Sequence, residues 1–263
     1  MDLSHWIERH AAFAPNKTAL LCAERAWTYR DLHCAIEQMA VALAAQGVTP
    51  GDRVAHLGYN SAEQVTLLFA CARLGALFVP LSWRLAPPEH CIMLSDCQPQ
   101  VLLVDQPFVE ASATLREALG GCACVCMGPA RAGWTALDEL LSAVPAGAAQ
   151  VSRASLDSPL LLCYTSGSTG QPKGVVLTQN ALFYNAVNSA HMHDMCSDDV
   201  ILTSLPLFHV GGLNIQTLPA LHCGASVILQ PRFEPGAVID ALQTQGVTLT
   251  VLVPAQRKGQ ETS

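Results

Sequence analysis

Residues 164–174 form a polar, glycine-rich segment of the kind that binds phosphate groups. Its sequence is Tyr-Thr-Ser-Gly-Ser-Thr-Gly-Gln-Pro-Lys-Gly. Glycine permits positive φ angles and close approach of a ligand, so backbone N–H groups become available to anionic oxygens. Hydroxyl groups add further donors, and Lys173 adds a positive charge. The hydroxyl donors are Thr165, Ser166, Ser168 and Thr169, and the glycines are Gly167, Gly170 and Gly174. This composition predicts a polyphosphate site.

The flanking residues predict how this segment is held. Residues 160–163 and 175–177 are apolar runs of strand length, so the segment is predicted to be a loop between two strands. A flexible serine–glycine linker is the alternative interpretation, and two apolar flanks argue against it. A Walker A motif requires Gly-Lys-Ser/Thr at its end, whereas this loop ends in Pro172-Lys173-Gly174. The ordinary P-loop NTPases are therefore excluded.

The loop closely resembles the phosphate loop of the AMP-forming acyl- and aryl-CoA synthetases, members of the adenylate-forming family. Three other segments carry weaker or comparable resemblances. They are the aromatic-Thr-Tyr-x-x-Leu run at 27–32, the segment at 73–81 with Gly75-Ala76 and Pro80-Leu81, and the Pro-x-Phe-His-x-x-Gly pattern at 206–212. The family also includes luciferases and peptide-synthetase adenylation domains, and a remnant of the latter is a weaker alternative. The Phe208-His209 pair favours the CoA ligases.

The resemblance implies an ATP-dependent acyl-CoA synthetase that activates a carboxylic acid, fatty or aromatic, as an acyl-adenylate and transfers it to CoA. ATP and Mg²⁺ are the implied cofactors, with CoA as co-substrate. Residues 165–170 and Lys173 correspond to the ATP-binding positions, and Thr165 to a magnesium contact. His209 corresponds to a histidine near the acyl pocket, where it helps to position the carboxylate. At Gln179 the family often has histidine instead.

The resemblance stops at Pro254, and residues 255–263 form a polar tail. Family members are about twice as long, so residues 1–254 are expected to be a partial N-terminal AMP-binding domain. The family's Tyr-Gly-x-Thr-Glu and Thr-Gly-Asp segments and its lysine-bearing C-terminal domain have no counterpart here. This chain alone is therefore expected to be inactive or weakly active. The alternative is a non-catalytic module that binds a nucleotide or a partner, and uncovered apolar surface is expected to favour self-association.

The elements around these motifs predict a layered α/β fold. Helical patterns over 28–46, 61–74, 178–191 and 235–245 alternate with apolar runs over 54–57, 101–104, 122–127, 225–230 and 247–253. Such alternation favours largely parallel sheets. Thr28 and Asp31 have the spacing of a capping box, and Pro80 is expected to end the strand that precedes it. His191 with His193, and the cysteines at 122, 124 and 126, are read as ordinary residues and not as metal ligands.

Composition excludes several functional classes. The 263 residues are 51% hydrophobic and 13% charged, which indicates a globular chain with a large core. The net charge is −7 and no basic run is present, so nucleic acid is not expected as a partner. Neither a signal peptide nor a transmembrane segment is apparent, and the expected location is the cytoplasm. The eleven cysteines are odd in number and contain no CxxC pair, so free thiols are expected.

Overall fold

The computed structural model describes residues 1–145, 151, 153–165 and 172–253. The chain divides into two compact units. Unit 1 comprises residues 1–4, 35–58 and 64–180, and unit 2 comprises residues 5–34, 59–63 and 181–263. Within the described ranges, every helix is too short or too polar to cross a membrane.

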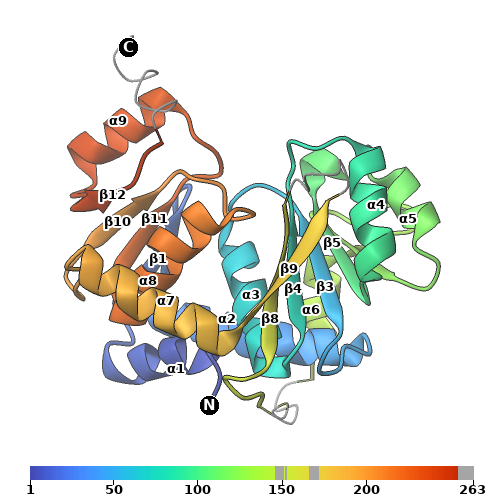
Figure 1. Cartoon of the computed structure of the whole chain (residues 1–263), viewed down its shortest axis with the longest axis horizontal. Helices are drawn as coiled ribbons and strands as arrows, with labels where there is room; N and C mark the ends of the chain where they lie inside the picture. The colour runs from blue at the N-terminus through green and yellow to red at the C-terminus, as the bar shows by residue number, and fades with distance from the viewer. Residues whose placement is uncertain (146–150, 152, 166–171, 254–263) are drawn as a thin grey trace. The chain divides into compact units, whose positions relative to one another are not determined.

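Unit 1 is built on a seven-stranded sheet with the strand order β7-β6-β5-β3-β4-β8-β9 (Figure 1). All neighbouring pairs are parallel except the last, β8 with β9, which is antiparallel. The predicted layered α/β fold with largely parallel sheets is therefore confirmed. The strands are β3 Arg53–Leu57, β4 Leu77–Leu81, β5 Val101–Asp105, β6 Ala123–Met127, β7 Thr135–Ala136, β8 Pro159–Thr165 and β9 Lys173–Thr178.

Helices connect the parallel strands of unit 1, as the sequence pattern predicts. The longest of them, α3, ends at Leu74, and Gly75 follows with a φ of +74°, a left-handed conformation that glycine adopts without strain. One hydrophobic core of this unit joins β4, β5 and α4, with Val79, Leu94 and Leu102 almost fully buried. The helical elements are α3 Ala62–Leu74, α4 Pro87–Cys97, η1 Gln106–Phe108, α5 Ala113–Ala118 and α6 Leu137–Ser142.

Pro80 lies inside strand β4, so the prediction that it ends the strand is wrong. β4 continues to Leu81, and Pro80 pairs in register with His56 of β3. On the other side, β4 pairs with β8 only at Phe78 and Leu161. Because the β8 ladder does not reach residue 80, the missing N–H of Pro80 leaves no gap in that ladder.

Unit 2 contains a five-stranded sheet with the order β12-β10-β11-β1-β2. Only β1 and β2 are antiparallel; β1 pairs in parallel with β11, which also pairs in parallel with β10. The predicted strand over 247–253 is reduced to the two residues of β12. The strands are β1 Thr18–Cys22, β2 Arg25–Thr28, β10 Val200–Thr203, β11 Ser226–Leu229 and β12 Leu249–Thr250. The helices are α1 Ser4–Phe13, α7 Gln179–Met192, the π-helical η2 Gly211–Thr217, α8 Leu218–Cys223 and α9 Pro235–Thr244.

The capping box predicted at Thr28 is present at the start of α2, Tyr29–Ala45. The backbone N–H of Thr28 donates to Asp31 Oδ2 at 2.9 Å, and the N–H of Asp31 donates to Thr28 Oγ1 at 3.1 Å. Each side chain thus satisfies a backbone donor at the helix N-terminus that no helical carbonyl can reach.

The structure gives the state of the cysteines and the contacts of one of the two histidines considered above. All eleven cysteines are free thiols. His193 Nδ1 lies 2.8 Å from the Ser189 carbonyl oxygen, one helical turn earlier. Among the described residues, no group of three or more histidine, cysteine or acidic side chains could hold a metal ion.

Candidate functional site

The segment predicted to bind phosphate lies between two strands, as predicted, and these strands, β8 and β9, are antiparallel. Thr165 and Lys173 are directly opposite each other in the strand register, and the Thr165 Oγ1 atom lies 3.5 Å from the Lys173 carbonyl oxygen. Both residues are exposed. The hairpin therefore fixes the two ends of the segment side by side. The predicted ligands Ser166, Gly167, Ser168, Thr169 and Gly170 lie outside the described residues.

Lys173 lines a cavity of about 610 Å³ in unit 1 together with Arg53, Asp96 and apolar side chains that include Leu162 and Val176. The Arg53 guanidinium donates to the carbonyl oxygens of Cys97, Gln98 and Gly51, the last two at 2.6 and 3.3 Å. Its charge is thus directed at backbone oxygens. The Lys173 ammonium group forms no hydrogen bond or ion pair with the described residues, and its positive charge is of the kind that attracts an anion.

Tyr164 anchors the base of the hairpin to α4. Its hydroxyl group lies 2.6 Å from Asp96 Oδ2 and 3.2 Å from the Met93 carbonyl oxygen. Burial raises the pKa of Tyr164 well above its usual value, and the neighbouring Asp96 carboxylate adds to this shift. The hydroxyl therefore stays protonated and donates to the Asp96 carboxylate. This hydrogen bond fixes Tyr164, the second-to-last residue of β8.

His209 lies in a turn of unit 2 between β10 and η2, with its side chain exposed. The backbone N–H of Gly211 donates to His209 Nδ1 at 3.1 Å. In a neutral imidazole only one ring nitrogen carries hydrogen, so accepting at Nδ1 places the hydrogen on Nε2. No described protein group is hydrogen-bonded to Nε2. The exposed side chain of His209 therefore presents its Nε2–H as a donor, which could bind a carboxylate oxygen.

Gly212 holds this turn against the backbone that precedes it. A Cβ atom at residue 212 would lie 2.5 Å from the Leu205 carbonyl oxygen and 2.7 Å from that of Pro206, so a larger residue does not fit without movement. The Gly212 carbonyl accepts a hydrogen bond from Thr217 Oγ1 at 3.0 Å. Glycine at this position thus permits a close approach of two backbone segments.

Asn60 also holds this turn, and sequence reasoning missed it. Its Nδ2 donates to the carbonyl oxygens of Leu205 and Gln230, both at 3.0 Å, and its Oδ1 accepts from the Leu207 N–H at 2.8 Å. The residue is only 3% exposed. Its partners are backbone atoms at least 145 positions away, so the sequence offered no signal beyond a polar residue in the Gly58-Tyr59-Asn60 turn.

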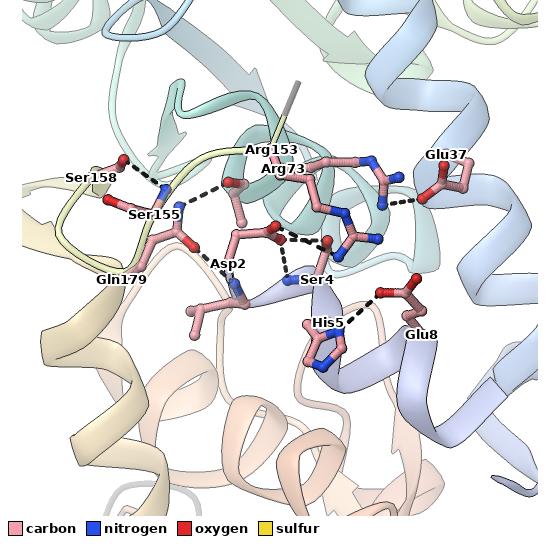
Figure 2. Close-up of polar contacts among 12 residues, drawn as sticks. Asp2, Ser4, His5, Glu8, Glu37, Arg73, Arg153, Ser155, Ser158 and Gln179 are labelled. Atoms are coloured by element: carbon pink, nitrogen blue, oxygen red, sulfur yellow. Dashed lines mark hydrogen bonds and ion pairs between the residues drawn. The ribbon is translucent and has the colours of Figure 1, made fainter. Parts of the chain in front are cut away.

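Gln179, the position where this chain departs from the family pattern, is fully buried in unit 1. Its Oε1 accepts from the Leu3 N–H at 2.8 Å, and its Nε2 donates to the Ala72 carbonyl at 2.8 Å. Figure 2 shows Gln179 beside a buried polar cluster near the N-terminus. In that cluster Asp2 accepts from the Ser4 N–H at 2.9 Å and pairs with Arg153 at 4.0 Å, and Arg73 pairs with Glu37. This network has a structural role, since it joins segments distant in sequence.

Comparison with known proteins adds independent findings. The family described as AMP-binding enzyme matches residues 7–258. An indoleacetate–CoA ligase of Aromatoleum aromaticum is 50% identical over 256 residues, which cover 97% of this chain and 50% of the ligase. A feruloyl-CoA synthase of an Amycolatopsis species is 40% identical over 252 residues, 96% of this chain and 48% of the synthase. The chain thus spans about half the length of the curated relatives it matches.

The fold also matches solved structures. An anthranilate CoA ligase in complex with anthranoyl-AMP superimposes with a TM-score of 0.91 at 26% identity. The match covers 97% of this chain and 50% of that protein. The two units described above therefore have the fold of half of that anthranilate CoA ligase.

Proposed function

Because the chain belongs to the AMP-binding enzyme family, we propose that residues 1–254 provide the ATP- and acid-binding part of an acid–CoA ligase. In the proposed reaction, a carboxylate oxygen attacks the α-phosphorus of ATP, pyrophosphate leaves, and an acyl-adenylate forms. The CoA thiol then attacks the acyl carbon, and AMP leaves with the bonding electrons. The remaining residues of such a ligase, about half of its length, supply the other side of the site.

The observation that carries this proposal is the register of the β8–β9 hairpin. It places Thr165 and Lys173 at the two ends of a seven-residue segment that is rich in hydroxyls and glycine. A lysine whose ammonium group has no partner among the described residues, beside hydroxyl and backbone donors, suits a polyphosphate. Residues 165–170 and Lys173 are accordingly proposed as the ATP-binding residues.

Thr165 is proposed as one ligand of the Mg²⁺ that accompanies ATP. Its exposed hydroxyl oxygen is the kind of donor that this cation accepts. The described residues offer no cluster of three acidic or histidine ligands. Phosphate oxygens and water usually supply most of the ligands of Mg²⁺ at nucleotide sites. When bound, it neutralises phosphate charge.

His209 is proposed to position the carboxylate of the acid. Its outward Nε2–H can donate to one carboxylate oxygen, while the adjacent Phe208 ring offers an apolar surface for the rest of the acid. The relatives named above act on indoleacetate and ferulate, and the matched structure holds an anthranoyl adenylate. We therefore favour an aromatic acid, with indoleacetate first and a fatty acid second.

ATP titration by calorimetry, with and without Mg²⁺, tests the phosphate site. The wild-type chain is expected to bind ATP, and Lys173→Ala to weaken binding about tenfold or more, since a charge-assisted bond to phosphate is lost. Lys17→Ala is the matched control, because it removes the same charge from unit 2. Equal affinity of the wild type and Lys173→Ala would contradict the assignment.

Pyrophosphate release tests turnover by the 263-residue chain alone. Stabilisation of transition-state charge requires preorganised groups on both sides of the reacting phosphate, and each is worth about 10²–10³ in rate. The chain without the other half is therefore expected to turn over indoleacetate only weakly. Rapid turnover would overturn this expectation while leaving the ligase assignment intact.

Strand β9 favours a second, non-catalytic function, in which copies of the chain associate with one another. Within the described residues β9 is an edge of the seven-stranded sheet, and its Val175 and Val176 side chains are 44% and 51% exposed. Long apolar edge strands pair readily with strands of other chains. The strand at the opposite edge, β7, has only two residues and offers little for such pairing. We expect self-association, which light scattering would detect. Val176→Lys should yield a monomer, and Leu242→Lys, an exposed change on α9, should not.

A further inference from the structure

Asn60 joins the ends of two neighbouring strands in unit 2. Leu205 and Gln230, whose carbonyls accept from its Nδ2, follow the parallel pair β10 and β11, which end in register at Thr203 and Leu229. The backbone N–H of Asn60 also donates to the Pro231 carbonyl at 3.1 Å. The side-chain amide therefore uses both of its N–H donors and its oxygen on the main chain.

Two of these bonds fix backbone atoms shortly before His209. The Leu205 carbonyl and the Leu207 N–H, two residues apart, are both held by the amide of Asn60. From Leu207 only Phe208 separates the fixed backbone from His209, whose ring is then oriented by the Gly211 N–H. The direction of His209 Nε2 thus depends on where Asn60 places the chain.

We propose that Asn60 is a positioning residue for the acid substrate, acting through His209. This inference rests on the proposed function of His209. Asn60 itself touches neither nucleotide nor acid; it directs the Nε2–H of His209 at the carboxylate. A purely structural asparagine would contribute to stability alone, so the two roles predict different results.

Two substitutions separate the positioning role from general stability. Asn60→Ala removes the whole clamp and leaves two carbonyls and one N–H without their buried partner. Asn60→Ser retains one short donor and acceptor, so its effect should be smaller. Tyr29→Phe is the matched control, because it removes a buried hydrogen bond to the Ala225 carbonyl, just before the other end of β11.

The experiment uses the 263-residue chain labelled with ¹³C in its histidine rings. The His209 signals are assigned from their loss in His209→Gln. Asn60→Ala should shift these signals and weaken indoleacetate binding about tenfold or more, with Asn60→Ser in between. Tyr29→Phe should lower the urea midpoint without moving the signals or the affinity.

Unchanged His209 signals in Asn60→Ala and Asn60→Ser, or equal shifts in Tyr29→Phe, would overturn the inference. A second outcome concerns the proposed function alone. If the wild type binds no indoleacetate although the His209 signals move in Asn60→Ala, the choice of substrate is wrong while the control of His209 geometry by Asn60 stands.

Discussion

Gln179 accepts a hydrogen bond from the backbone N–H of Leu3 at 2.8 Å, although 176 positions separate the two residues. The same side chain donates to the Ala72 carbonyl at the end of α3, so one amide connects three distant segments of unit 1. Because Gln179 directly follows β9, the strand that carries Lys173, this bond also fixes one end of the β8–β9 hairpin.

Gln179→Ala should lower the free energy of unfolding by about 2–4 kcal/mol, since it leaves two buried backbone groups unpaired at about 1–3 kcal/mol each. Urea denaturation followed by circular dichroism measures the loss. Gln243→Ala, an exposed change on α9, should have little effect. A loss in Gln179→Ala no larger than in this control would show that the bonds to Leu3 and Ala72 contribute nothing.

Thr28→Ala should destabilise the start of α2 by about 1 kcal/mol, the usual value of an N-cap side chain. The hydrogen bonds from Thr28 hold the pKa of Asp31 below its usual value. Because the pKa is lowered on folding, the stability from this carboxylate is present above its ordinary pKa and lost as the pH falls through the lowered one. Urea midpoints at neutral and acidic pH measure both effects.

Thr114→Ala is the control for this change, since Thr114 is exposed in α5. It should leave the urea midpoint almost unchanged at either pH. If Thr28→Ala changes the urea midpoint no more than Thr114→Ala does, the capping box does not contribute to stability.

Two buried thiols predict a loss of stability at alkaline pH. Burial raises the pKa of Cys97 and of Cys163 to about 11, against an ordinary value near 9.0. Their contribution is complete below pH 9.0 and is lost as the pH rises toward 11, at up to about 1.4 kcal/mol per pH unit for each thiol. Urea denaturation between neutral pH and pH 10.5, with a reductant present, measures the slope.

Cys163→Ala should reduce this slope, because the variant has one fewer thiol to ionise on unfolding. Cys34→Ala, which removes an exposed cysteine, is the matched control. Identical slopes in Cys163→Ala and the wild type would rule out ionisation of this thiol as a cause.

Gly212→Ala should cost about 1–3 kcal/mol, as overpacking of a closed site does, because the new methyl group meets two carbonyl oxygens. It should also displace His209, so its ring signals should shift. Gly120→Ala is the control, since a Cβ atom there meets nothing within 4 Å. Normal stability and unshifted His209 signals in Gly212→Ala would show that the turn yields to the added group.

Local patterns in the sequence predicted the parts of the fold that depend on neighbouring residues. The two strands on either side of residues 166–171 were predictable because apolar runs flank a polar segment, and α2 because Thr28 and Asp31 lie three residues apart. The Pro80 prediction failed because the extent of pairing between β4 and β8 is a tertiary property. Asn60 and Gln179 were not recognised as clamps because all their partners are distant backbone atoms.

Strand β1 has a consequence for how the protein folds during its synthesis. Leu20 of β1 pairs with Val227 of β11, so the sheet of unit 2 cannot close until more than two hundred residues have been made. Contacts of such sequence separation form slowly, because a long loop must be closed first. Unit 1 lies almost wholly between these strands in the sequence and can therefore fold earlier on the ribosome. Until β11 has been made, β1 lacks its parallel partner.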